Sequence, residues 1–335
     1  MALRMRTTLT LVSLAALAAC SESGPTSSDS SPATPVFDNA SDQAGDHPQR
    51  RVFELRNSPG ARNAASRRGG GTGIVNHGGP VLQAATKVVA IYWASAPVYT
   101  GGPAVGTSST SGSTGDNSLV GHFLRNLGGS PYFNINSTYT NSAGVKIANI
   151  VNYTGFWANA TNAPSSTSTA TISDAQMIAM LQSGFNSGAL VYDANTLYLI
   201  FTAGKANLGG GFGTQYCGYH TNGSVTIGGV AKAALYSAMP YDYAYPAGCT
   251  SGRSSPNGDP AADAEVSVLA HEIEETTTDP FGNAWYDTRG YENADKCAWN
   301  YGTTANSNMV LGGKSFLVQL NWVNSGSGGC VVSWP

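Results

Sequence analysis

Four stretches of the chain carry the apolar patterns that are typical of β-strands. Residues 81–94, 145–153 and 195–203 are rich in β-branched and aromatic side chains, which favour strands. Residues 224–238 alternate between apolar and polar positions well enough to predict a hairpin. The chain is therefore expected to contain a sheet.

Two segments have the apolar spacing and the flanking residues of short helices. Residues 117–127 form the first, which is followed at once by Gly128 and Gly129. Ser173 is suited to cap the second helix, which is expected to end near Gly188.

A third helix is predicted to begin at Asp259, because Asp is a favoured N-cap and the next residue, Pro260, is a favoured first-turn residue. It should end by about Thr278, since Pro280 disfavours helical geometry at the residue before it. Four apolar residues recur at helical spacing and define the face that packs into the core: Val266, Leu269, Ala270 and Ile273. The order of elements shows no regular alternation of strand and helix, so we predict an α/β (α+β) fold, a mixed sheet with a few helices.

The first 73 residues are predicted to lie outside the folded domain. Residues 1–20 have a basic start and an apolar run too short to cross a bilayer, which is typical of an export signal. The signal ends in Leu17-Ala18-Ala19-Cys20, which resembles the lipobox of bacterial lipoproteins; an ordinary signal peptide with a chance Cys is the alternative. Residues 21–73 are rich in Ser, Pro, Arg and Gly and predict a disordered linker, which leaves residues 74–335 as one domain.

The four cysteines that follow Cys20 predict two disulfides, because exported proteins fold in an oxidising environment. Three pairings are possible. We favour Cys217 with Cys249 and Cys297 with Cys330, since each closes a loop of roughly 30 residues, a length that stabilises by about 3 to 4 kcal/mol.

Charge is scarce in the domain and unevenly distributed. Ten acidic residues lie between Asp259 and Asp295, a segment that contains a single Arg. Crowded carboxylates repel one another unless cations neutralise them. The pattern therefore favours cation binding, and the lack of a basic face argues against nucleic acid as a partner.

The third predicted helix carries H-E-x-x-E, from His271 to Glu275. Residues four apart lie one turn above each other, so these two side chains can bind one ion. In the related H-E-x-x-H motif two His bind zinc and the Glu between them takes a proton from the metal-bound water. Glu272 occupies that place. A carboxylate in place of the second His leaves Ca²⁺ or Mn²⁺ as alternatives to Zn²⁺.

Two ligands do not hold a catalytic zinc, and the polar segment after the helix offers a third. Glu292 is the first choice; Asp295 is the second, as a ligand or as a group that orients one. His220 lies beside a predicted disulfide, where it can donate a hydrogen bond to a developing oxyanion or serve as a structural histidine. The alternative to a metal site is a solvated acidic helix face, which the short motif alone does not exclude.

Four short motifs, in this order, resemble the exordium / phosphate-induced protein family, known in plants as extracellular, growth-associated proteins. They are His77-Gly78-Gly79-Pro80, Cys217-Gly218-Tyr219-His220, Pro256-Asn257-Gly258-Asp259 and Thr278-Asp279-Pro280-Phe281. The resemblance covers about residues 75–335 and implies an extracytoplasmic protein. The plant members lack the His-Glu pair of this chain, so the chain resembles a metal-bearing bacterial branch with a zincin-like active-site helix, save for the missing second His.

Together these patterns favour an exported metal-dependent hydrolase, a zinc peptidase that acts on a peptide or a cell-surface polymer. The alternative is a non-enzymatic cell-surface binding protein with a structural ion. Either protein is expected outside the cytoplasm, in the periplasm or at the cell surface, with the lipid at Cys20 as its one tie to the bacterial membrane.

Overall fold

The structure is a computed structural model that describes residues 51–54, 73–209, 212–213, 216–304 and 306–335. The predicted signal peptide, Cys20 and most of the predicted linker lie outside these residues. Within the segment predicted to be a disordered linker, the structure instead has strand β1 (Arg51–Glu54). Its sequence, Arg-Val-Phe-Glu, alternates and contains two residues that favour strands, a signal too short to stand out in the surrounding polar sequence.

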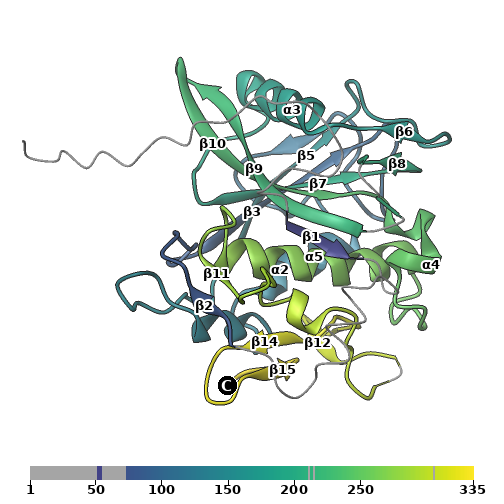
Figure 1. The fold of residues 1–335 in the computed structure, drawn as a ribbon. Coiled ribbons are helices and arrows are strands. Elements are labelled where there is room, and N and C mark those ends of the chain that lie inside the picture. The colour runs from purple at the N-terminus through teal and green to yellow at the C-terminus, as the bar shows by residue number, and fades with distance from the viewer. Residues whose placement is uncertain (1–50, 55–72, 210–211, 214–215, 305) are drawn as a thin grey trace, which may run out of the picture. The chain divides into compact units, whose positions relative to one another are not determined.

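A seven-stranded mixed sheet forms the centre of the domain, in the order β1-β9-β10-β7-β3-β5-β4 (Figure 1). The four middle strands run parallel: β10 (Val230–Met239), β7 (Thr196–Thr202), β3 (Thr86–Trp93) and β5 (Val151–Asn159). The outer strands β9 (Tyr216–Ile227), β1 and β4 (Ser108–Ser109) are antiparallel to their neighbours. Both faces of β7 are buried, which explains its continuous apolar sequence. The predicted mixed α/β fold is confirmed.

The predicted hairpin is strands β9 and β10. Their two-residue turn consists of Gly228 and Gly229, whose φ angles of 57° and 80° belong to the type I′ turn that glycine favours. The strand predicted at residues 145–153 was placed too early, because β5 begins at Val151. Val145 is 49% exposed, and the chain around it turns back to pair Thr140 with Lys146.

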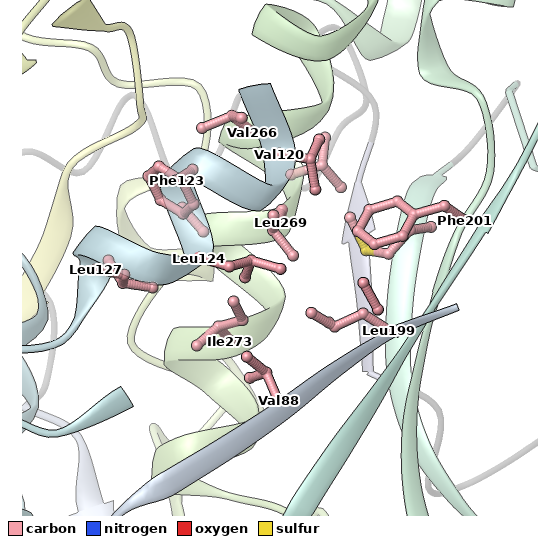
Figure 2. Close-up of a cluster of buried hydrophobic side chains, with 14 of the residues drawn as sticks. Val88, Val120, Phe123, Leu124, Leu127, Leu199, Phe201, Val266, Leu269 and Ile273 are labelled. Carbon is pink, nitrogen blue, oxygen red and sulfur yellow. The ribbon is translucent and has the colours of Figure 1, made fainter. Parts of the chain in front are cut away.

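Helices cover both faces of the sheet (Figure 1). Helix α3 (Asp174–Ser187) lies on one face and begins with the predicted cap at Ser173. Helices α2 (Leu119–Leu127) and α5 (Pro260–Thr278) lie on the other face. Figure 2 shows the core between them, where side chains of α2 and α5 meet side chains of β3 and β7.

Helix α5 begins and ends as predicted, but more than its apolar face is buried. Asp259 caps it by accepting a hydrogen bond from the amide of Ala262. Every residue from Glu265 to Thr278 is buried, because the sheet and α2 cover one side and the C-terminal segments cover the other. A solvated acidic face is therefore excluded.

Short elements complete the domain. Four two-stranded sheets pair β2 (Val75–Asn76) with β11 (Trp285–Tyr286), β6 (Ala170–Thr171) with β8 (Ala206–Asn207), β12 (Met309–Leu311) with β13 (Lys314–Phe316), and β14 (Asn321–Val323) with β15 (Gly329–Val331). The other helices in the described residues are α4 (Pro246–Cys249) and the 3-10 turns η1 (Phe133–Thr138), η2 (Asp242–Ala244) and η3 (Asp295–Cys297).

Two disulfides join Cys217 to Cys249 and Cys297 to Cys330, which confirms the predicted pairing. The first links β9 to α4, and the second links η3 to β15. In the part of the chain that the structure describes, no helix has both the length and the apolar character needed to cross a bilayer.

Candidate metal centre

The candidate residues come from three parts of the chain and meet in the interior. Helix α5 contributes His271, Glu272 and Glu275, β9 contributes His220, and the segment that leads into η3 contributes Glu292 and Asp295. The side chain of Asp295 is 14% exposed, and the other five residues are at most 1% exposed. The structure thus brings together the residues that the sequence singled out.

One set of possible ligands surrounds His271. Its Nε2 lies 2.9 Å from Glu275 Oε1 and 3.6 Å from Asp295 Oδ1. The backbone amide of Asp295 donates a hydrogen bond of 2.9 Å to the same Glu275 oxygen, which fixes η3 against the helix. These three side chains can offer ligand atoms that all lie within 4.8 Å of one another.

A second set surrounds His220 and shares Glu275 with the first. His220 Nδ1 lies 3.7 Å from Glu275 Oε2, and His220 Nε2 lies 3.9 Å from Glu292 Oε1. Glu275 thus directs one oxygen to each set. Glu292, the first choice to complete the His271–Glu275 pair, groups with His220 instead, and Asp295 takes the place expected of Glu292.

Glu272 lies beside these ligand sets. Its Oε2 is 3.2 Å from His220 Nδ1, and its Oε1 has no hydrogen-bond partner among the residues that the structure describes. Gly218, two residues before His220 on β9, leaves space near this oxygen: a Cβ there would lie 3.4 Å from Glu272 Oε1. His220 therefore contacts the predicted base directly.

The separations between the ligand atoms fit a small divalent ion. Nitrogen and oxygen ligands lie about 2.1 Å from zinc, so two ligands of a tetrahedral ion are about 3.4 Å apart. The distances from His271 Nε2, 2.9 and 3.6 Å, bracket this value. Those in the His220 set, 3.7 and 3.9 Å, are slightly longer. One imidazole with two carboxylates also suits manganese.

Burial sets the protonation of the site. It lowers the pKa of His271 to about 4, so the imidazole is neutral at neutral pH, which is the form that binds metals. Burial raises the pKa of Glu272 well above its usual value, and the charges of Glu275 and Asp295 raise it further. A cation at the site would oppose this shift and favour the carboxylate.

Two amide side chains hydrogen-bond to residues of α5, and sequence reasoning missed both. The Gln319 side chain hydrogen-bonds His271 Nδ1, which leaves Nε2 facing Glu275. Asn321 Nδ2 donates a hydrogen bond of 2.7 Å to Glu274 Oε2. These residues are uncharged and lie over 40 positions from their partners, so no local pattern could have revealed them.

Two other acids of the crowded segment have structural roles. Asp279 Oδ1 accepts 2.6 Å hydrogen bonds from the amides of Asn283 and Ala284, which closes the turn after α5. Asp287 pairs with Arg289 and Lys296.

A second group of buried acids consists of Glu265, two turns before Glu272 on α5, and Asp242 on η2. Burial raises the pKa of Glu265 to about 8. Burial also raises the pKa of Asp242 well above its usual value, and the charges of Glu265 and Glu272 raise it further. Glu265 is therefore largely protonated at neutral pH.

Comparison with known proteins places this site in a family. Residues 129–313, more than half of the chain, match the family described as the phosphate-induced protein 1 conserved region. The chain belongs to this family. It is 37% identical over 123 residues to Protein EXORDIUM-like 3 of Arabidopsis thaliana. The match covers 32% of this chain and 36% of that protein, so the chain spans about a third of the relative's length. No solved structure gives a significant match.

The family and the two disulfides together identify an extracytoplasmic protein, because disulfides persist in oxidising compartments. The region that matches the family contains α5 and every candidate residue of the site.

Proposed function

We propose that the protein is an exported metal-dependent hydrolase, most consistent with a peptidase, and that its lipid anchor is Cys20. The observation that carries the proposal is the position of Glu272. Its carboxylate lies in the same buried cluster of polar side chains as two His-carboxylate sets, with Oε1 lacking a hydrogen-bond partner in the described residues.

In this proposal His271, Glu275 and Asp295 would hold an ion. His220 and Glu292, near the other oxygen of Glu275, would form a second ligand set or would orient the first. A divalent ion bound here would lower the pKa of a water molecule and polarise a carbonyl oxygen. Glu272 would take the proton at Oε1, while the contact of Oε2 with His220 fixes its orientation.

The burial of the cluster supports a second candidate function, a cell-surface binding protein in which the ion is structural. His220, Glu272 and Glu275 are almost completely buried, as is common for structural sites. In that case the carboxylates would serve the fold, and no proton transfer by Glu272 would be needed.

Metal analysis and turnover of Glu272→Gln decide between these functions. We expect about one zinc per chain in the wild type and in Glu272→Gln, a large loss of zinc in His271→Ala, and no hydrolysis of a mixed peptide library by Glu272→Gln. Glu274→Gln is the matched control: Glu274 is equally buried on the same helix, but its carboxylate bonds to Asn321, so the variant should retain both zinc and hydrolysis.

If the wild type contains metal but neither the wild type nor Glu274→Gln hydrolyses peptides, the result would favour a structural ion. Metal bound equally by wild type and His271→Ala, or by neither protein, would contradict the proposed site.

A further inference from the structure

The candidate centre lies next to an edge of the main sheet that the chain's own N-terminal segment occupies. Strand β1 is the outermost strand and pairs antiparallel with β9, with Arg51 opposite His220 and Phe53 opposite Gly218. Without β1, β9 would be the edge, and its outward backbone amides and carbonyls would be open to another strand.

The stretch of β9 that β1 covers is the stretch that contacts the predicted base. His220 bonds to Glu272, and the Cβ position of Gly218 faces the same carboxylate. Residues two apart on a strand share a face, so these positions lie on the face of β9 that meets α5. Strand β1 also approaches α5 (Figure 1).

The substrate of a hydrolase must reach this interior, and β1 is the element best suited to move away and admit it. His220 is 1% exposed and Glu272 is 0% exposed, so some covering element must move before a substrate reaches them. Strand β1 has four residues and one neighbouring strand, whereas β9 has twelve residues and is tied to α4 by a disulfide. Short edge elements open at the lowest free-energy cost.

We propose that β9 is the docking strand for an extended polypeptide substrate, and that β1 occupies it within the same chain until an incoming peptide replaces it. This inference rests on the proposed hydrolase function, and it adds the strand that would hold the peptide and the segment that covers this strand. Main-chain hydrogen bonds to β9 would align the peptide antiparallel, as β1 is now, and would carry one of its peptide bonds past Glu272.

Proline variants of β1 test the proposal in the chain from Ser21 to Pro335. Alternate residues of an antiparallel strand direct their N–H groups toward and away from the neighbour. Of Val52→Pro and Phe53→Pro, only one therefore removes a hydrogen bond to β9, and the other is its matched control. The probe is a fluorescent peptide with the sequence of Pro48 to Asn57, and the same peptide with proline at both positions is the negative probe.

We expect one of the two variants to bind the fluorescent peptide at least tenfold more tightly than the wild type, because apparent affinity falls with the fraction of chains whose docking strand is free. The proline peptide should bind to none of them. Hydrogen exchange at the amides of residues 216–220 in the wild type gives a second measurement, in which excess peptide should slow exchange if it takes the place of β1.

Failure of both variants to bind the peptide, with no effect of the peptide on hydrogen exchange, would overturn the docking strand. Equal affinity for wild type and both variants would show that β1 does not occupy it. Zinc content and hydrolysis, measured on the same preparations, separate this result from the proposed function. Peptide binding without zinc would support the docking strand and contradict the hydrolase. Zinc and hydrolysis without peptide binding would support the hydrolase and contradict the docking strand.

Discussion

Replacing Glu265 with glutamine should make the stability of the protein less dependent on pH. Glu265 lies in the interior on α5, where burial raises the pKa of its carboxyl from 4.5 to about 8. Between these values the folded chain keeps a proton that the unfolded chain has released. Stability from this group is therefore complete below pH 4.5 and is lost as the pH rises toward 8. Glutamine has nearly the same shape and does not ionise.

The size of the effect follows from the shift in pKa. One unit corresponds to about 1.4 kcal/mol, so the change from 4.5 to about 8 corresponds to roughly 5 kcal/mol of pH-dependent stability. Glutamine offers an NH2 donor in place of the acid O–H, and neither carboxyl oxygen of Glu265 has a hydrogen-bond partner in the described residues, so the substitution itself should cost little at low pH. At pH 8 the folded carboxyl is only about half ionised, so roughly 4 kcal/mol of the effect applies. We therefore expect Glu265→Gln to be nearly as stable as wild type at pH 4.5 and about 4 kcal/mol more stable at pH 8.

Urea denaturation of both proteins at the two pH values measures this difference. A chelator in every sample removes ion binding as a contribution. Both proteins also carry Asp242→Asn, because Glu265 raises the pKa of Asp242 and the titration of Asp242 would otherwise differ between them. Curves that stay the same distance apart at pH 4.5 and pH 8 would refute the reasoning, because they would show that Glu265 ionises in the folded chain as readily as in the unfolded one.

Two further substitutions test the scaffold around the site. Removing the second disulfide with Cys297→Ala and Cys330→Ala together should lower the free energy of unfolding by about 3 to 4 kcal/mol, because the loop it closes spans 33 residues; a change below 1 kcal/mol in urea denaturation would contradict this. Leu269→Ala should lower the free energy of unfolding by about 2 to 5 kcal/mol, because Leu269 on α5 is fully buried in the core that α5 forms with α2 and the sheet. The control Val310→Ala, at a position that is 66% exposed, should change it by less than about 0.5 kcal/mol. Equal losses in the two variants would argue against the core in Figure 2.

Local signals in the sequence predicted the elements that they specify directly. Asp259 and Pro260 fix the start of α5, and Ser173 fixes the start of α3, because the capping hydrogen bonds involve neighbours in the chain. The disulfide pairing followed from loop length. Strand β5 was misplaced because residues 145–150 are as apolar as those that follow, and parallel pairing with β3, a distant segment, selects Val151–Asn159.

The composition of the candidate site was predicted better than its arrangement. The i,i+4 spacing brought His271 and Glu275 together on one helix, which a pattern can show. Whether Glu292 or Asp295 joins them depends on how the chain turns into η3, and no spacing rule encodes that turn. The contact of His220 with Glu272 depends on sheet order, which places β9 over the helix.

The support that Gln319 and Asn321 give to α5 bears on how the protein is cut into fragments for study. The match to the family ends at residue 313, and a fragment drawn to that limit would seem to contain the whole site. It would leave His271 and Glu274 without these amide contacts, and it would leave Cys297 without Cys330. A fragment that ends there is expected to lose the order of the site even though it contains every candidate ligand, so a useful fragment must extend at least to Cys330.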